Sequence, residues 1–211
     1  FKIAIEDIDS EQYEAAEAAI VFVNKVAKAV SSKDDEAEHF IIWARASLAR
    51  SYKAVQNIRV KSGLAVALAD LKWPDGFKEF KAELDEYKNV PWARQYVIAL
   101  IRALGLLKDD QAVPVLLSLF QGTNMFFQSP ALEAMGTLQA LSVFNIIEGV
   151  LEKPEIYSTS IRISSAIALG NYGGETAKLK LEHQLIFEND FEVKQVIKET
   201  LKKLGSEQQL R

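Results

Sequence analysis

The chain of 211 residues has no cysteine and only two histidines. Without cysteine, disulfide bonds, thiolate metal sites and cysteine nucleophiles are excluded. The two histidines, His39 and His183, leave little for a histidine-based metal or acid–base centre. A basic excess is also missing: the net charge is −4, whereas a general nucleic-acid binder normally carries a positive surface. No apolar run approaches the roughly 20 residues of a membrane span. We therefore expect no cofactor, no metal, no nucleic acid and no membrane span.

The remaining composition is that of an ordinary globular protein. Hydrophobic residues make up 49% and charged residues 26% of the chain, which excludes disorder as its main description. Acidic residues gather at one end: residues 1–40 hold 10 acidic and 4 basic residues (net −6), and residues 41–211 hold 19 and 21 (net +2). The opening Phe1-Lys2-Ile3 has no signal-peptide anatomy. We expect a cytoplasmic location and a chain that is a processed or excised piece of a longer protein.

The few prolines indicate where helices begin and end. Proline costs about 3 kcal/mol inside a helix but is tolerated in its first turn. Ser129 before Pro130 is typical of an N-cap followed by the first helical residue, and Pro114 falls in the first turn of a helix that Asp109 and Asp110 cap. Between the prolines, apolar residues recur every three or four positions and no strand pattern appears. The prediction is an all-α chain, with helices at 10–30, 35–54, 58–71, 75–88, 92–105, 110–121, 129–138, 139–151, 157–172, 174–187 and 191–204.

Several of these predicted helices share one frame of 13 residues. Four segments superpose without gaps, and a weaker fifth fits: VKSGLAVALADLK (60–72), ARQYVIALIRALG (93–105), IRISSAIALGNYG (161–173), VKQVIKETLKKLG (193–205) and FQSPALEAMGTLQ (127–139). The second position of the frame recurs at steps of 33, 34, 34 and 32 residues. Another helix separates each segment from the next. Repeats of this period predict stacked helical hairpins, because no single hairpin can bury its own apolar face.

The frame resembles HEAT repeats, particularly the bacterial type related to phycocyanobilin-lyase HEAT repeats. The second helix of that type follows the pattern Val-Arg-x-x-Ala-x-x-Ala-Leu-Gly-x-Leu-Gly, and Ile161-Arg162, Ala168-Leu169-Gly170 and Gly173 match it best. The resemblance covers residues 60–205. It implies a right-handed α-α superhelix, a solenoid of about five helical hairpins. Armadillo and tetratricopeptide arrays are the alternatives, but the Trp, Leu-Gly and Tyr positions of tetratricopeptide repeats do not recur here.

The first residues of the chain lack the frame. We interpret residues 1–56 as acidic N-terminal capping helices together with the first helix of the array, because the end of an array needs a polar outer face. Residues 57–211 then form one continuous repeat domain.

The basic residues at the second position of the frame are the most prominent charged pattern. In families of this resemblance, such a residue commonly pairs with an acidic or amide residue in the turn just before its helix. This interpretation makes a structural ladder of Lys61, Arg94, Arg162 and Lys194, with the turn residues Asn89, Asn124, Glu155 and Asp190 as partners. The alternative hypothesis is that the ladder lines a binding face.

A different set of residues forms the predicted binding face. Arg102, Lys198 and Lys202 fall outside the packing positions of the frame, so we expect their charges to reach solvent along long stems. Lys198 and Lys202 continue a basic stripe on the last helix. Met125 and Phe126 sit in a turn, where exposed Met and aromatic residues make good anchors. We expect these five residues to bind a protein partner with an acidic segment on the concave face.

Other features weigh against catalysis. Trp43, Trp73 and Trp92 raise the alternative of a DNA-glycosylase-like solenoid, but we expect all three in core or turn packing. The pairs Glu38-His39 and Glu182-His183 have the reverse order of the His-Glu pairs that iron-binding HEAT hydroxylases need. The sequence has no phosphate loop, G-x-S-x-G or H-E-x-x-H motif. We expect a non-catalytic protein-interaction scaffold or adaptor; the alternative is a HEAT-type enzyme or enzyme subunit, DNA-repair glycosylase-like or bilin-lyase-like.

Overall fold

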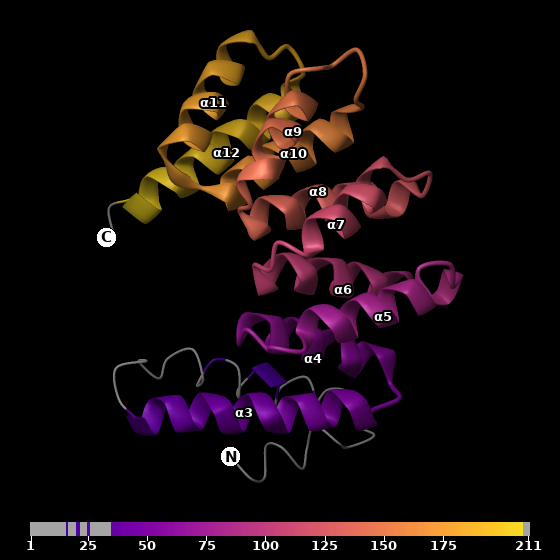
Figure 1. Cartoon of the computed structure of the whole chain (residues 1–211). Coiled ribbons are helices and arrows are strands. Elements are labelled where there is room, and N and C mark those ends of the chain that lie inside the picture. The colour runs from indigo at the N-terminus through magenta and orange to yellow at the C-terminus, as the bar shows by residue number, and fades with distance from the viewer. Residues whose placement is uncertain (1–15, 17–19, 22–24, 26–34, 209–211) are drawn as a thin grey trace. The chain divides into compact units, whose positions relative to one another are not determined.

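The computed structural model of the chain describes residues 16, 20, 21, 25 and 35–208. All elements of this described part are helices, which confirms the all-α prediction (Figure 1). The backbone divides into two compact units, residues 1–107 and residues 108–211. Most of the predicted helix over 10–30 lies outside the described residues. The predicted domain boundary after residue 56 stays a prediction.

The described part of unit 1 holds two helical hairpins. Its helices are α3 (Asp35–Ala54), α4 (Ile58–Asp70), α5 (Gly76–Tyr87) and α6 (Arg94–Leu107), with a 3-10 turn η1 (Pro91–Ala93) before α6. Helix α3 packs on α4, α5 packs on α6, and the second helices α4 and α6 pack on each other. The Asn57 side chain caps α4 by accepting the Arg59 N–H at 3.0 Å. Apolar side chains such as Leu64, Leu68 and Leu100 are fully buried between the helices.

Unit 2 repeats the same pattern three times. Its helices are α7 (Ala112–Gln121), α8 (Met125–Leu138), α9 (Leu141–Leu151), α10 (Thr159–Tyr172), α11 (Gly174–Phe187) and α12 (Phe191–Gln208). The hairpins are α7/α8, α9/α10 and α11/α12, and the second helix α10 packs against both α8 and α12. This arrangement confirms the predicted repeat of helical hairpins.

A glycine of the frame lets the second helices approach closely. A Cβ atom built on Gly136 of α8 would lie 2.1 Å from the carbonyl oxygen of Ala168 in α10. One repeat later, a Cβ atom on Gly170 would lie 2.3 Å from Cγ2 of Thr200 in α12. Real Cβ contacts are never this short, so both positions require glycine for the observed packing. The glycine in the Ala-Leu-Gly part of the motif is therefore a packing residue.

The use of proline to locate helix starts gave the wrong start for one helix. The prediction placed the start of α8 at Ser129-Pro130, but the helix begins at Met125 and Pro130 lies inside it. The Asn124 side chain caps the helix by accepting the Phe126 N–H at 3.1 Å. Burial of Phe127, Ala131 and Leu132 along α8 compensates for the lost backbone hydrogen bond at proline.

Candidate functional site

Three turns of unit 2 lie side by side. They join α7 to α8 (residues 122–124), α9 to α10 (152–158) and α11 to α12 (188–190). The rings of Phe120 and Tyr157 stack at a centroid distance of 6.1 Å, which connects the first turn to the second. The Thr159 hydroxyl donates to the Asp190 carboxylate at 2.5 Å, which connects the second to the third. We call this end of unit 2, with the residues that flank the three turns, the turn edge.

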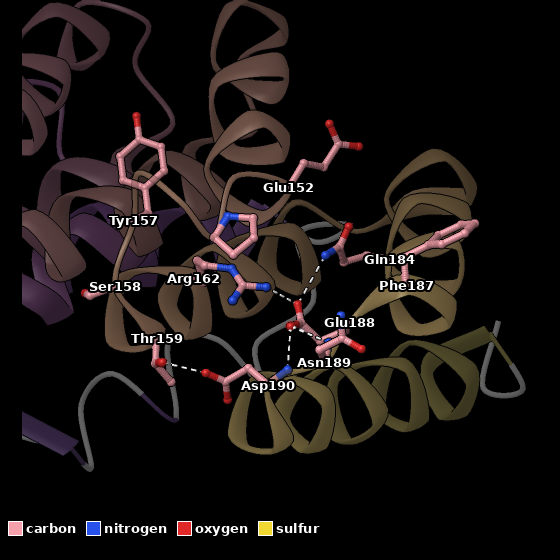
Figure 2. A pocket seen from close by; sticks show the side chains of 11 residues that line it. Glu152, Tyr157, Ser158, Thr159, Arg162, Gln184, Phe187, Glu188, Asn189 and Asp190 are labelled. Atoms are coloured by element: carbon pink, nitrogen blue, oxygen red, sulfur yellow. Dashed lines mark hydrogen bonds and ion pairs between the residues drawn. The ribbon is translucent and has the colours of Figure 1, made fainter.

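The second and third turns enclose an open cleft of about 540 Å³, which we call the acidic cleft (Figure 2). Three carboxylates and one guanidinium line it, together with hydroxyl, amide and aromatic side chains. The lining residues are Glu152, Pro154, Tyr157, Ser158, Thr159, Arg162, Gln184, Phe187, Glu188, Asn189 and Asp190.

A buried ion pair forms the floor of the acidic cleft. Arg162 and Glu188 are 4% and 3% exposed, and the guanidinium binds the carboxylate through Nη2 (Figure 2). The guanidinium also donates through Nε to the Leu151 carbonyl at 3.1 Å, at the end of α9. The Glu188 carboxylate accepts the Gln184 amide at 3.1 Å and the N–H groups of the next two residues at 3.0 and 2.9 Å. A buried charge pair with this many hydrogen bonds holds consecutive hairpins together.

Hydrogen bonds lower the pKa of two carboxylates of the cleft, Glu188 and Asp190. Burial raises the pKa of Glu188, but hydrogen bonds from Arg162, the Asp190 N–H and Gln184 outweigh it, so the net pKa lies below its ordinary range. The hydrogen bond from the Thr159 hydroxyl, with those from two backbone N–H groups of α12, lowers the pKa of Asp190. Arg162 neutralises one carboxylate, which leaves the charges of Asp190 and Glu152 in the cleft.

A second cleft of about 470 Å³ lies between the first and second turns. It shares Tyr157 and Ser158 with the acidic cleft, and the rest of its lining carries no charge. These other residues are Phe120, Gln121, Gln128, Ile156 and Ile161. We call it the apolar cleft.

Large apolar side chains are exposed around both clefts. The described part of unit 2 has eight large apolar residues with high exposure, and six of them flank the three turns: Met125, Phe126, Ile156, Ile186, Phe187 and Phe191. The exposed fraction of each is between 56% and 78%. The other two are Leu141 and Leu179. Exposed apolar surface in unit 2 is thus concentrated at the turn edge.

The structure separates the predicted binding residues into three places. Met125 and Phe126 are exposed at the turn edge, in the first turn of α8. Lys198 and Lys202 are exposed on α12, four residues apart on one helix face. Arg102 is exposed on α6 and belongs to unit 1. Their assignment to one concave binding face stays a prediction.

Two of the ladder residues, Lys61 and Arg162, pair with carboxylates other than the predicted turn residues. Lys61 pairs with Glu83 of the next hairpin at 2.5 Å, as Arg162 pairs with Glu188 of the next hairpin. Gln128 donates to the Gly122 carbonyl at 2.9 Å. These side chains therefore bind the end of the preceding helix or the hairpin that follows.

Two of the predicted turn partners cap helices. Asn124 and Asp190 accept backbone N–H groups at the starts of α8 and α12. Glu155 is exposed and is not the partner of Arg162. Arg94 is exposed on the first turn of α6, and Lys194 is half-buried on α12.

The expectation of core or turn packing is confirmed for Trp73 and wrong for Trp43. Trp92 is exposed but packs in its turn, with its ring centroid 6.1 Å from that of Tyr87. Trp73 is buried, with its ring 5.8 Å from that of Phe80. Trp43 and Trp92 are 40% and 69% exposed. The 3-10 turn buries Ala93 in place of Trp92, and the buried side of α3 is occupied by other residues, such as Ala44, Leu48 and Tyr52.

The sequence analysis missed a row of contacts at the other end of the hairpins. Lys72, Lys108 and Gln139 follow the second helices with positive φ angles of 55°, 57° and 63°. Lys72 donates to the Leu106 carbonyl, and Lys108 donates to the Gln139 side chain. Gln139 in turn donates to the Tyr172 carbonyl at 2.7 Å. The sequence held a signal for these positive φ angles. Lys72 and Gln139 both hold the last position of the frame, and Gly173 holds the same position in its own repeat, where a glycine after a helix indicates left-handed backbone.

Metal clusters and membrane-spanning helices are both absent from the described residues. No group of three or more His, Asp or Glu side chains is placed to hold a metal ion there. None of the helices in the same residues combines the length and the apolar character that crossing a membrane requires.

Comparisons with known proteins bear on the repeat. The family model described as PBS lyase HEAT-like repeat matches residues 98–122. No curated protein matches the chain. Among solved structures, the chain is similar to human deoxyhypusine hydroxylase in complex with glycerol, with a TM-score of 0.49 and 14% sequence identity; the match covers 96% of this chain and 73% of that one. The resemblance to PBS-lyase-type HEAT repeats is therefore confirmed, and the family model places it on residues 98–122.

Proposed function

We propose that the chain is a non-catalytic protein-interaction module and that it binds its partner at the turn edge of unit 2. One observation carries the proposal: six of the eight exposed large apolar residues in the described part of unit 2 flank the three turns and their two clefts. Clustered apolar residues beside polar ones are characteristic of protein interaction sites.

The local structure supports the proposal because it holds the apolar residues out of the core. Phe187 ends α11 and Phe191 begins α12, with the buried Glu188 between them. The carboxylate of Glu188 takes up the N–H groups of the turn, so the backbone there is fixed. Anchors on a fixed backbone lose little conformational entropy on binding.

The basic residues give a second candidate surface. Lys198 and Lys202 are exposed along α12 of unit 2. A partner with an acidic segment suits such a surface, since opposite charges steer association.

Site-specific photo-crosslinking tests the proposal. We would place p-benzoylphenylalanine at Phe187, at Phe126 or, as a control, at Leu179, which is equally apolar and exposed on α11 but lies away from the turns. We expect positions 187 and 126 to crosslink to the same protein in extracts of the source cells, and position 179 not to. Equal crosslinking at all three positions, or crosslinking at 179 alone, would show that the turn edge is not the interface. An activity of the purified chain on a small molecule would contradict the non-catalytic part.

A further inference from the structure

The two clefts of the turn edge differ in charge although they adjoin. Tyr157 and Ser158 line both. On one side of them the apolar cleft has walls of Phe120, Ile156 and Ile161, with two amides. On the other side the acidic cleft opens between carboxylates. A partner that fills both clefts must therefore present an apolar group beside a charged or strongly polar one.

The charge of the partner's polar group follows from the acidic residues of the second and third turns. Residues 152–158 and 188–192 carry five carboxylates and a single lysine. One of these carboxylates, Glu188, is neutralised by Arg162. The guanidinium is itself almost fully buried and occupied by Glu188 and the Leu151 carbonyl, so it does little to attract an anion. Glu152 is exposed, and Figure 2 shows Glu152 and Asp190 on opposite sides of the Arg162–Glu188 pair, with the Asp190 carboxylate turned toward Thr159.

We propose that the turn edge binds a segment of another protein in which a bulky apolar residue enters the apolar cleft and a neighbouring lysine or arginine enters the acidic cleft. The inference rests on the proposed function and specifies the partner. Charge complementarity decides the sign of that second group, because the lining of the acidic cleft keeps two carboxylates, Glu152 and Asp190, beyond the one that pairs with Arg162. The exposed Phe187 and Ile156 flank the two clefts and cover the apolar stems of such a segment.

Peptide selection on the whole chain tests the inference. Random 12-residue peptides displayed on phage would be selected on residues 1–211, and the enriched peptides would be synthesised with a fluorescein label. We expect a lysine or arginine within a few residues of an aromatic or large aliphatic residue. Glu152→Lys should weaken their binding in fluorescence anisotropy by about tenfold or more, since it places a positive charge in the lining of the cleft.

The matched control is Glu182→Lys, which reverses an exposed charge on α11 that does not line either cleft. We expect the Kd of the peptides for this variant to stay within about twofold of the native value, since an isolated exposed charge contributes little. Glu152 is the C-cap residue of α9, where lysine is favourable toward the helix dipole, so the fold is retained. Circular dichroism melts check this.

The outcomes separate the two proposals. Enriched peptides that are acidic, or that bind Glu152→Lys as tightly as the native chain, overturn the inference about the basic residue. If Ile156→Ser and Phe187→Ser still abolish their binding, the turn edge remains the interface and the proposed function stands. If no peptide is enriched, or if binding is independent of Ile156 and Phe187 as well, both proposals fail.

Discussion

The two units use the same position of the repeat for two different ion pairs. In unit 1, Lys61 of α4 pairs with Glu83 of the following hairpin, and both side chains are 17% exposed. In unit 2, Arg162 of α10 pairs with Glu188 of the following hairpin, and the side chains are 4% and 2% exposed. The planar guanidinium reaches both the carboxylate and the Leu151 carbonyl, whereas an ammonium acts as a point charge. Both units thus join consecutive hairpins by an ion pair at this position of the repeat, and they differ in the cation, which is an ammonium in unit 1 and a guanidinium in unit 2.

The surroundings of the two pairs differ as well. In unit 1, Tyr96 donates to Glu83, the hydroxyls of Tyr52 and Tyr96 lie 3.0 Å apart, and Lys61 Nζ lies 5.1 Å from the Tyr52 ring centre. Burial raises the pKa of both tyrosines, so they stay neutral hydrogen-bonding groups. In unit 2 the pair borders a cleft that is open to solvent. Aromatic side chains close over the pair in one unit, and the other unit leaves room beside it for a partner.

The largest expected effect comes from removing the carboxylate of the buried pair. Glu188→Ala leaves the Arg162 guanidinium buried without a counter-charge, so we expect a loss of about 3–5 kcal/mol in the free energy of unfolding. Glu83→Ala should cost less, about 1–2 kcal/mol, because the flexible Lys61 stem can carry its charge to water. Urea unfolding measures both, with circular dichroism for the whole chain and tryptophan fluorescence for unit 1, which holds all three tryptophans. Equal losses would refute the distinction between the pairs.

Glycine substitutions compare how closely the helices approach in the two units. Gly136→Ala places a Cβ atom 2.1 Å from the Ala168 carbonyl oxygen, so α8 and α10 must separate, at a cost of about 1–3 kcal/mol. Gly63 of α4 is the matched site, because its Cβ atom would meet Ile20 Cδ1 at 3.5 Å, an ordinary contact. Gly63→Ala should stabilise the chain by up to about 1 kcal/mol through helix propensity. Thermal melts that show no loss for Gly136→Ala would contradict the close approach.

The dependence of stability on pH tests the buried pair of unit 2 under acid conditions. The folded pKa of Glu188 lies below its ordinary value of 4.5, so the unfolded chain binds more protons in that window and stability falls as the pH drops through it. We expect the urea midpoint of the native chain to decrease below about pH 4.5, and Glu188→Ala to lose part of this decrease. Parallel pH profiles for the two proteins would show that other carboxyl groups cause the acid sensitivity.

The fold was predictable because it depends on local and periodic signals. The frame of 13 residues located the second helices, and the predicted end of the helix over 110–121 agrees with the end of α7 at Gln121. The start of α8 was missed because Ser129-Pro130 has the local chemistry of a helix start, while burial along α8 outweighs the cost of an internal proline. Local rules thus fail where packing between helices competes with them.

The site was predictable only in part because it is formed by contacts between repeats. Met125 and Phe126 stood out in the sequence since they sit next to a turn. Ile156, Phe187 and Phe191 did not, because an apolar residue at a helix end looks the same whether it faces the core or solvent. Glu188 lies 26 residues from Arg162, and its role follows from the stacking of hairpins, which no local motif encodes.

The smallest effect on stability is expected from the basic stripe of α12. Lys198→Glu with Lys202→Glu changes two exposed charges, so we expect the free energy of unfolding to change by no more than about 0.5 kcal/mol. The two lysines lie about 10 and 16 Å along α12 from its first residue, at a rise of about 1.5 Å per residue. A short peptide held in the clefts of the turn edge should therefore bind the double variant as tightly as the native chain in fluorescence anisotropy. If its binding weakens as much as with Glu152→Lys, the partner extends from the turn edge along α12, and the stripe is part of the same interface. A third outcome is an acidic partner that binds the native chain and Glu152→Lys but not the double variant. In that case the basic residues form the interface, and the open cleft of unit 2 is not the feature that distinguishes the two units in function.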